Sequence, residues 1–298
     1  MPIAALPELL DAARNGGYAV GYFESWDLYS LEAVLDAAEE ERSPVVVGFG
    51  GMMTDGAWLE TRGVAMLGAA ARAAVERASI PAALMFNEAQ TLAQADAALE
   101  SGFNCLLLST DTLPGPEALR VTASLARRAH AVGVAVEAEL GRLPDYVAGR
   151  EVGGERTDPA EARAFVDAAG VDCLAVSIGN VHVKADGWAS IDRARLEALH
   201  DVVRVPFALH GGTSFPPEAV RHAVQHGVAK FNVGTALKRA CWDALRNTVC
   251  SMPPDVDVHE ALGSHRAGDL TQAARRTLTE TVRERMRLYG SSGQADLR

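Results

Sequence analysis

Side chains that can bind a metal or move a proton stand at the ends of several apolar segments of this chain. They are Asn87 and Glu88, Glu137 and Glu139, Asn180 and His182, His210, and Asn232 and Thr235. Carboxylates and imidazoles are costly to bury unless they are paired or bind a metal. Histidines and a carboxylate around an open position suit a catalytic divalent cation. A single histidine could be a hydrogen-bonded structural residue, but His182 and His210 together favour a metal site.

A glycine-rich loop follows His210. Residues 211–213 read Gly-Gly-Thr, and a proline-led helix start lies near Pro216. Backbone amides in such a loop can bind a phosphate. The next apolar segment ends in "NVGT", residues 232–235, and Lys230 is a candidate cation near this loop. Either motif alone is common, but two of them after consecutive strands favour a phosphate site over a plain turn.

Eight short apolar segments must position these side chains. They cover residues 18–23, 44–49, 81–86, 105–110, 134–140, 173–178, 206–211 and 230–235. Segments with helical spacing and many alanines lie between them. Continuous apolar strands are typical of a parallel sheet that is covered on both faces. Eight strands alternating with helices predict an α/β fold, a (β/α)8 TIM barrel, whose strand C-termini carry the site. A doubly wound open sheet is the alternative.

The two ends of the chain add to this pattern. The first twenty residues read as a helix, and residues 273–298 predict a long amphipathic helix followed by a glycine-serine tail. This extra C-terminal helix is expected to pack either on its own barrel or on a partner subunit. The whole chain, residues 1–298, is expected to form one domain of about the size that suits a TIM barrel with additions.

Composition limits the classes of partner. The chain has 298 residues, a net charge of −11, 48% hydrophobic residues and 22% charged residues. The negative charge argues against nucleic acid and anionic membranes as partners, and no apolar run of membrane-spanning length occurs. The N-terminus lacks the order of a signal peptide. The four cysteines show no paired spacing, so we expect reduced thiols and a cytoplasmic enzyme.

Several longer segments resemble the class II, metal-dependent fructose-bisphosphate aldolases, also called ketose-bisphosphate aldolases. They are "VEAELGRL", "TDPAEARAFVDAAGVDCLAVSIGNVH", "ALHGGTSFPPEAVRHAVQHGVAKFNVGTALKRA" and the terminal "LYGSSGQA". The match runs along nearly the whole chain. The resemblance implies a homodimeric or homotetrameric barrel that cleaves or forms a carbon–carbon bond next to a ketose phosphate, such as a dihydroxyacetone-phosphate unit. It also implies a divalent cation, usually Zn²⁺.

The resemblance assigns roles residue by residue. It implies that His182 and His210 are metal ligands and that Glu139 holds the metal in an alternative position. It implies that the phosphate and the ketose end bind to the two loops. The loop residues that match are Gly211, Gly212, Thr213, Asn232, Gly234 and Thr235. The family commonly has serine at the position of Thr213, which is a mild change.

The third predicted strand departs from the family. The family reads His-x-Asp-His there, whereas this chain reads "MFNE", residues 85–88. Asn87 replaces an aspartate that donates a proton, so it can hydrogen-bond but cannot shuttle a proton. Glu88 replaces a ligand histidine and can still bind a cation. A carboxylate ligand lowers the net charge of the site and widens the choice of ion from Zn²⁺ to Mn²⁺, Co²⁺ or Fe²⁺.

The enolising base is also altered. The family supplies it from a glycine-rich acidic loop, whereas this chain reads "PDYVAGREV" after "ELGRL". Asp145 in that loop is the first candidate. Glu24, at the end of the first predicted strand where the family has asparagine, is the second candidate.

These changes leave three functions open. The first is an aldolase-type lyase with a non-standard aldehyde side, because Glu24, Met85, Phe86, Asn87 and residues 48–56 would reshape that side. The second is isomerisation or epimerisation of a sugar phosphate. The third is non-catalytic binding of a sugar phosphate. The retained histidines and phosphate loops favour the lyase, although ordinary fructose-bisphosphate cleavage is not expected.

Overall fold

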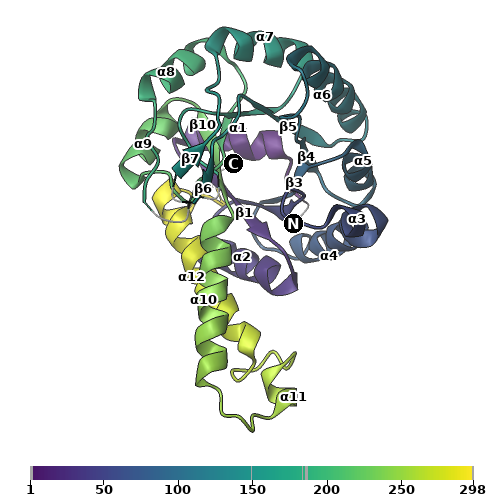
Figure 1. The fold of residues 1–298 in the computed structure, drawn as a ribbon, viewed down its shortest axis with the longest axis vertical. Coiled ribbons are helices and arrows are strands. Elements are labelled where there is room, and N and C mark those ends of the chain that lie inside the picture. Colours follow the sequence, from purple (N-terminus) through teal and green to yellow (C-terminus); the bar gives the residue numbers. More distant parts are fainter. Residues whose placement is uncertain (1–2, 149, 183, 185–186, 297–298) are drawn as a thin grey trace.

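Eight parallel strands close into a barrel in the computed structural model, which describes residues 3–148, 150–182, 184 and 187–296 (Figure 1). The strands are β1 (Val20–Ser25), β2 (Val45–Gly50), β3 (Ala82–Ala89), β4 (Cys105–Leu108), β5 (Ala135–Leu140), β8 (Cys173–Val176), β9 (Phe207–Leu209) and β10 (Val228–Val233). The barrel closes because β1 pairs with β2 on one side and with β10 on the other. The predicted TIM barrel is confirmed.

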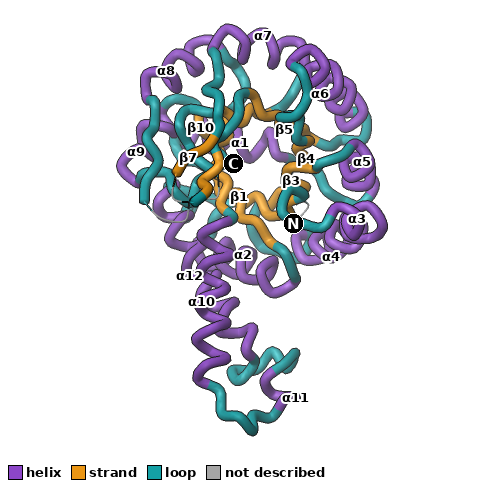
Figure 2. Tube along the Cα trace, viewed as in Figure 1, coloured by secondary structure: helices purple, strands orange, loops and turns teal. Residues whose placement is uncertain are grey.

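Helices surround the barrel, and part of the last helices extends away from it as an arm, as the tube in Figure 2 shows. They are α1 (Leu6–Gly16), α2 (Leu28–Glu41), α3 (Gly56–Trp58), the π-helical η1 (Leu59–Gly63), α4 (Val64–Val75), α5 (Leu92–Glu100), α6 (Gly115–His130), α7 (Pro159–Ala169), α8 (Arg193–Val202), α9 (Pro217–Gln225), α10 (Thr235–Ser251), α11 (Val258–Ala261) and α12 (Leu270–Tyr289). Among the described residues, no helix combines the length and the apolar composition that crossing a membrane requires.

The eighth barrel strand begins and ends two residues earlier than predicted. The sequence pattern extends it to Thr235, but β10 ends at Val233 and Thr235 begins α10. The Thr213 hydroxyl accepts a hydrogen bond from the backbone N–H of Ala236 at 3.0 Å. This bond satisfies one of the free amides of the first helical turn, so a side chain from another loop fixes where the helix begins.

A two-stranded antiparallel hairpin lies outside the barrel. It consists of β6 (Asp145–Val147) and β7 (Arg150–Val152), and Asp145 also forms a bridge to His182. The sequence pattern predicts only a loop here. The bridge places the hairpin directly beside the residues that follow β8.

The C-terminal helix packs on its own chain and forms an arm with α10 (Figure 1). Arg275 of α12 binds Asp36 of α2, and Arg283 binds Glu41 at 2.9 Å. Burial raises the pKa of Glu41, but the hydrogen bonds from Arg287, Ser292 and Arg283 outweigh it and lower that pKa to about 2. These ion pairs tie α12 to α2, while α11 lies at the far end of the arm.

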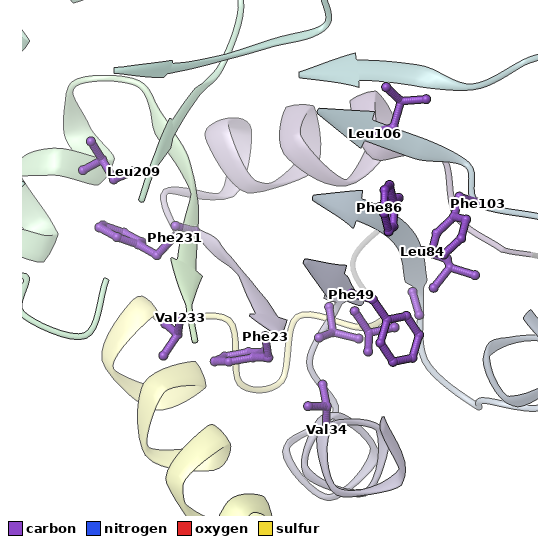
Figure 3. Packing of buried hydrophobic residues seen from close by; sticks show 14 of the residues in the cluster. Phe23, Val34, Phe49, Leu84, Phe86, Phe103, Leu106, Leu209, Phe231 and Val233 are labelled. Carbon is purple, nitrogen blue, oxygen red and sulfur yellow. The ribbon is translucent and has the colours of Figure 1, made fainter. Parts of the chain in front are cut away.

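Two apolar layers build the core. The outer layer lies between strands and helices, where Figure 3 shows Phe23, Phe49 and Phe86. Phe86 packs against Phe103 at 5.4 Å between ring centroids, so the expectation that it reshapes the aldehyde side is wrong. The inner layer fills the barrel and includes the buried free cysteines Cys105 and Cys173. Side chains alternate along a strand, so the neighbours of Phe86 point into the barrel.

Candidate active site

A cavity of about 180 Å³ opens at the C-terminal ends of the barrel strands. It is lined by all but three of the predicted site residues, the exceptions being Asp145, Gly212 and Glu139. The lining residues are Tyr22, Glu24, Met52, Met53, Asn87, Glu88, Val181, His182, His210, Gly211, Thr213, Asn232, Val233, Gly234, Thr235 and Lys238. Candidate metal ligands and candidate phosphate loops therefore face the same space.

Glu88, His182 and His210 converge on one point of this cavity. Their ligand atoms all lie within 4.8 Å of one another. The Glu88 Oε1 atom is 3.2 Å from His210 Nδ1 and 3.8 Å from His182 Nε2. Two ligands of a tetrahedral zinc, each about 2.0–2.1 Å from the ion, are roughly 3.3–3.4 Å apart. The three groups therefore have the donor chemistry and spacing that a small divalent cation requires.

The backbone at Glu88 is specialised for this position. Its φ is +54°, which is unusual for a residue with a side chain. The register of β3 against β4 shifts between Phe86 and Ala89, which marks an irregularity in the strand. A non-glycine residue with such a positive φ costs of order 1–3 kcal/mol in backbone strain. It persists only where the surrounding structure fixes that conformation. The irregularity allows the carboxylate to meet two histidines that follow other strands.

A buried network of ion pairs and hydrogen bonds contacts His210. His210 Nε2 lies 3.0 Å from Glu137 Oε1, and Glu137 pairs with Lys230 at 2.9 Å. An Nε2–H that donates to Glu137 leaves the Nδ1 lone pair free to bind a metal. The Asn180 amide donates to the backbone carbonyl of His210 at 2.9 Å. The Asn232 side chain also contacts Lys230, close to the imidazole.

The pKa values in this network follow from burial and pairing. Burial raises the pKa of Glu137, but the charge of Lys230 and the hydrogen bond from His210 outweigh it and lower that pKa to about 2. Burial lowers the pKa of His210, but hydrogen bonds to Glu137 and Glu88 raise it to about 10. Burial keeps the pKa of His182 below its ordinary value despite the attraction of Glu88. Without a cation, two carboxylates thus hold a proton on His210.

Sequence reasoning missed the roles of Glu137 and Lys230. Glu137 was noted at a strand end but given no role, and Lys230 was expected near the phosphate loop. Lys230 is fully buried and pairs with Glu137 inside the barrel instead. The signal for this contact was a carboxylate and an ammonium group in two apolar strands. Burying either charge is costly unless the two pair.

Close backbone contacts shape the two candidate phosphate loops, residues 211–213 and 232–235. Gly211 has φ +71°, and a Cβ there would lie 2.3 Å from the carbonyl oxygen of Val181. The Gly212 N–H donates to the carbonyl of Asn232 at 2.9 Å, which joins the two loops but turns that amide away from the cavity. The first turn of α10 opens beside them at Thr235. Free amides at a helix start favour an anion.

Glu24 lies between two glycines at this rim. A Cβ on Gly234 would be 2.2 Å from Glu24 Oε2, and a Cβ on Gly50 would be 3.1 Å from Oε1. The carboxylate accepts a hydrogen bond from Lys238 Nζ at 2.7 Å. Sequence reasoning did not find Lys238, which supplies the cation at this loop that Lys230 was expected to supply.

Comparison with known proteins shows the family of this chain. The model of the family described as "Fructose-bisphosphate aldolase class-II" matches residues 4–294. The chain belongs to the class II fructose-bisphosphate aldolase family. It is 33% identical to the fructose-bisphosphate aldolase of Geobacillus stearothermophilus, with 99% of each chain covered. It is also 33% identical to that of Thermus caldophilus, with 97% of this chain and 98% of the relative covered.

Solved structures agree with the family. The crystal structure of the YdjI aldolase from Escherichia coli K12 aligns with a TM-score of 0.81 and 27% identity, covering 99% of this chain and 100% of that one. Membership makes this chain a class II aldolase-type lyase. The His and Glu group described above is its candidate site for a divalent metal.

In this class II aldolase, Asp145 lies behind the metal group rather than in the cavity. Its Oδ1 is 3.9 Å from His182 Nδ1, whereas His182 Nε2 faces Glu88. The Tyr146 N–H donates to the His182 carbonyl at 3.2 Å. The Asp145 side chain is half exposed. The role of Asp145 as base stays a prediction.

Glu139 lies outside the three-residue ligand group. It borders a second cavity of about 420 Å³, together with Asp111 and Arg142. Burial raises the pKa of Glu139 to about 7, because the attraction of His210 does not offset it. The expected role of Glu139 as an alternative metal ligand therefore stays a prediction.

Proposed function

We propose that this class II aldolase is divalent-metal-dependent and cleaves or forms a carbon–carbon bond next to a ketose-phosphate unit resembling dihydroxyacetone phosphate. One observation carries the proposal: the Glu88, His182 and His210 group shares a cavity with the two phosphate-type loops. The proposal includes an electrophile other than the usual aldehyde phosphate. Metal analysis of the purified protein, followed by a screen of ketose phosphates for release of dihydroxyacetone phosphate, tests it.

The metal would be held by Glu88, His182 and His210. Zn²⁺ fits two imidazoles and a carboxylate with an open position best, and Mn²⁺, Co²⁺ or Fe²⁺ suit the same donors. A bound cation would polarise the ketone and stabilise the enediolate. Glu137 and Asn232 both lie next to His210 Nε2, and Asp145 Oδ1 lies 3.9 Å from the other nitrogen of His182. Glu139 is the proposed ligand for a second metal position.

The phosphate would bind where the two loops meet the start of α10. The groups that face this point are Gly211, Thr213, Gly234 and Thr235 in the main cavity, with Asn232 beside them. Thr213 and Thr235 also line an adjacent cavity of about 300 Å³ together with Arg239 and Arg285. These arginines place positive charge in that second cavity. Positive charge therefore lies on both sides of the two threonines.

Glu24 lies next to the proposed phosphate loops, and other side chains line the rest of the cavity. Its carboxylate lies beside Gly234 and Gly50 and accepts a hydrogen bond from Lys238 Nζ at 2.7 Å, so it offsets the charge of that cation. Met52 and Met53 line the same cavity, and Met53 is 68% exposed. These apolar side chains offer a second phosphate no charge to pair with, so the proposed electrophile is an aldehyde without a phosphate group.

Phosphate is expected to stabilise the folded protein. About 10 mM inorganic phosphate or dihydroxyacetone phosphate should raise the melting temperature, because a ligand at 10–100 times its Kd adds roughly 1.4–2.7 kcal/mol to the free energy of unfolding. Differential scanning fluorimetry measures the shift. Dihydroxyacetone, which lacks the phosphate, serves as the control ligand and should give a smaller shift. An unchanged melting temperature with millimolar phosphate ligand would contradict the site.

Asp145→Asn is expected to lower turnover at least tenfold, which corresponds to about 1.4 kcal/mol of barrier. Removing a proton next to the ketone needs a base near the carbon acid, and Asp145 stands on the hairpin beside His182. Metal content should not change. Glu151→Gln, on the paired strand of the same hairpin, is the control. If turnover on the best ketose phosphate is unchanged in Asp145→Asn, Asp145 is not the base and Glu24 becomes the candidate.

Assembly and location remain predictions. The arm of α10, α11 and α12 exposes Trp242, Val249, Val258 and Leu262. Exposed apolar groups of this kind support a homodimer or homotetramer. The family match over residues 4–294 supports a single domain, and a cytoplasmic location is proposed from the free cysteines.

A further inference from the structure

Tyr22 carries a buried hydroxyl that has no role in the proposals above. It lies on β1 between Val20 and Glu24, and its side chain points into the barrel because it alternates with Phe23. Only 2% of Tyr22 is exposed, yet it lines the main cavity. Its hydroxyl has no hydrogen-bond partner among the described residues. Buried hydroxyls almost always have a partner, so this one points to a ligand.

Asn87 supplies a second unpaired atom in the same cavity. It is 5% exposed, and its Oδ1 atom also lacks a partner within the described residues. Tyr22 offers a donor and acceptor hydroxyl, and Asn87 offers an acceptor. Both line the cavity beside Glu88. A substrate hydroxyl can accept a hydrogen bond from the Tyr22 hydroxyl and donate one to Asn87 Oδ1.

The surroundings of Tyr22 keep its proton in place. Burial raises the pKa of Tyr22 well above its ordinary value, and the carboxylates of Glu24, Glu88 and Glu137 raise it further. The Lys230 ammonium lies 5.5 Å from the ring centroid, but it already pairs with Glu137. Tyr22 is therefore a neutral O–H donor in a site rich in carboxylates. Carboxylates alone cannot donate a hydrogen bond when they are ionised.

We propose that Tyr22 and Asn87 form the subsite for the carbonyl oxygen of the electrophile, a short hydroxyaldehyde, and that Tyr22 donates the proton to it. This rests on the proposed aldolase function. In the condensation direction, the enediolate carbon forms a bond to the aldehyde carbon. The electron pair of the C=O π bond moves to the oxygen, which takes the proton from the Tyr22 hydroxyl. Solvent then returns a proton to the phenolate. In the product, Asn87 Oδ1 accepts a hydrogen bond from the new hydroxyl.

Two reactions of one enzyme test the assignment. Exchange of the carbon-bound protons of dihydroxyacetone phosphate with deuterium oxide, followed by NMR, needs no electrophile. Condensation of dihydroxyacetone phosphate with a panel of short hydroxyaldehydes, including glyceraldehyde, needs one. Tyr22→Phe removes a single oxygen from the core. It should leave exchange within about threefold of wild type and lower condensation by about 100-fold, the lower range for general acid catalysis.

Tyr289→Phe is the matched control. Tyr289 also has a buried hydroxyl without a partner among the described residues, but its ring stacks on Phe231 and does not line the cavity. The ratio of exchange to condensation should stay unchanged in this variant. The double variant Tyr22→Phe with Asn87→Asp supplies a carboxyl group next to the same oxygen and should restore part of the condensation rate.

The outcomes separate this assignment from the proposed function. Unchanged condensation in Tyr22→Phe overturns the role of Tyr22, and so does an equal loss of both reactions, because an equal loss places Tyr22 on the ketose half. A wild-type protein that exchanges but condenses with no aldehyde of the panel overturns the hydroxyaldehyde subsite. A wild-type protein that holds metal but does not exchange contradicts the aldolase proposal itself.

Discussion

Replacing Lys230 with methionine is expected to lower the free energy of unfolding by about 3–5 kcal/mol, because it leaves a buried charge without its partner. Lys230 and Glu137 have fully buried side chains, and their charged groups lie 2.9 Å apart. In the variant, Glu137 keeps the contact with His210 but loses its pairing with a full positive charge. Urea unfolding at neutral pH measures the loss.

The pH dependence of the Lys230→Met variant gives a second readout. In the native protein, Glu137 has a pKa of about 2, below the ordinary value of 4.5. Its pairing therefore stabilises the protein above about pH 4.5, and this stability is lost as the pH falls toward 2. In the variant, burial without Lys230 raises the pKa of Glu137, so a protonated Glu137 is tolerated. The destabilisation should shrink as the pH is lowered from 7 toward 4.5.

The double variant Lys230→Met with Glu137→Gln is the control for this pair. Removing both charges together avoids an unpaired buried ion, so part of the lost stability should return. Equal stabilities for wild type and Lys230→Met would show that the pair does not hold the barrel interior together. A double variant that is less stable than the sum of the single changes would lead to the same conclusion.

His210→Ala is expected to remove most of the bound metal, with an affinity more than about 100-fold lower. Loss of an outer-shell partner alone typically costs 10–100-fold, and His210 Nδ1 is one of three converging ligand atoms. Metal content after dialysis, measured by mass spectrometry, gives the result. His182→Ala should behave in the same way, and it leaves the contact between His210 and Glu137 in place.

A second histidine cluster provides the control for the metal prediction. Glu197, His222 and His226 also bring three ligand atoms within 4.8 Å of one another, but on the surface of α8 and α9. Glu197 is exposed, and His222 already contacts it at 2.9 Å. His222→Ala should therefore leave the metal content unchanged. Full metal content in His210→Ala, with loss in His222→Ala, would place the metal on the surface cluster instead.

The sequence alone determined the barrel and the kind of site. Eight apolar segments at regular spacing predict eight strands, because hydrophobic periodicity is a local property of the chain. Parallel strands place their C-terminal ends at one rim, so His182, His210 and the glycine loops had to meet there. Glu88 was placed in the group by the family resemblance, because it stands where the family has a ligand histidine.

Strand limits were predicted less well than strand number. The end of β10 was placed two residues too late, because the first turn of α10 depends on the Thr213 hydroxyl, 23 residues away along the chain. The hairpin of β6 and β7 was missed because its pairing involves only three residues on each side. So short a ladder leaves too little periodicity to detect.

Only the tertiary structure decided which polar side chains meet. Lys230 turned out to pair with Glu137, 93 residues earlier, rather than with a phosphate. Glu24 lies beside Gly234 and accepts a hydrogen bond from Lys238. The Tyr22 hydroxyl has no hydrogen-bond partner among the described residues. The physical reason is that strand alternation tells which face a side chain occupies, but not what lies opposite. In a closed barrel the opposite group comes from a distant strand, and burial then selects the pairs that leave no charge uncompensated.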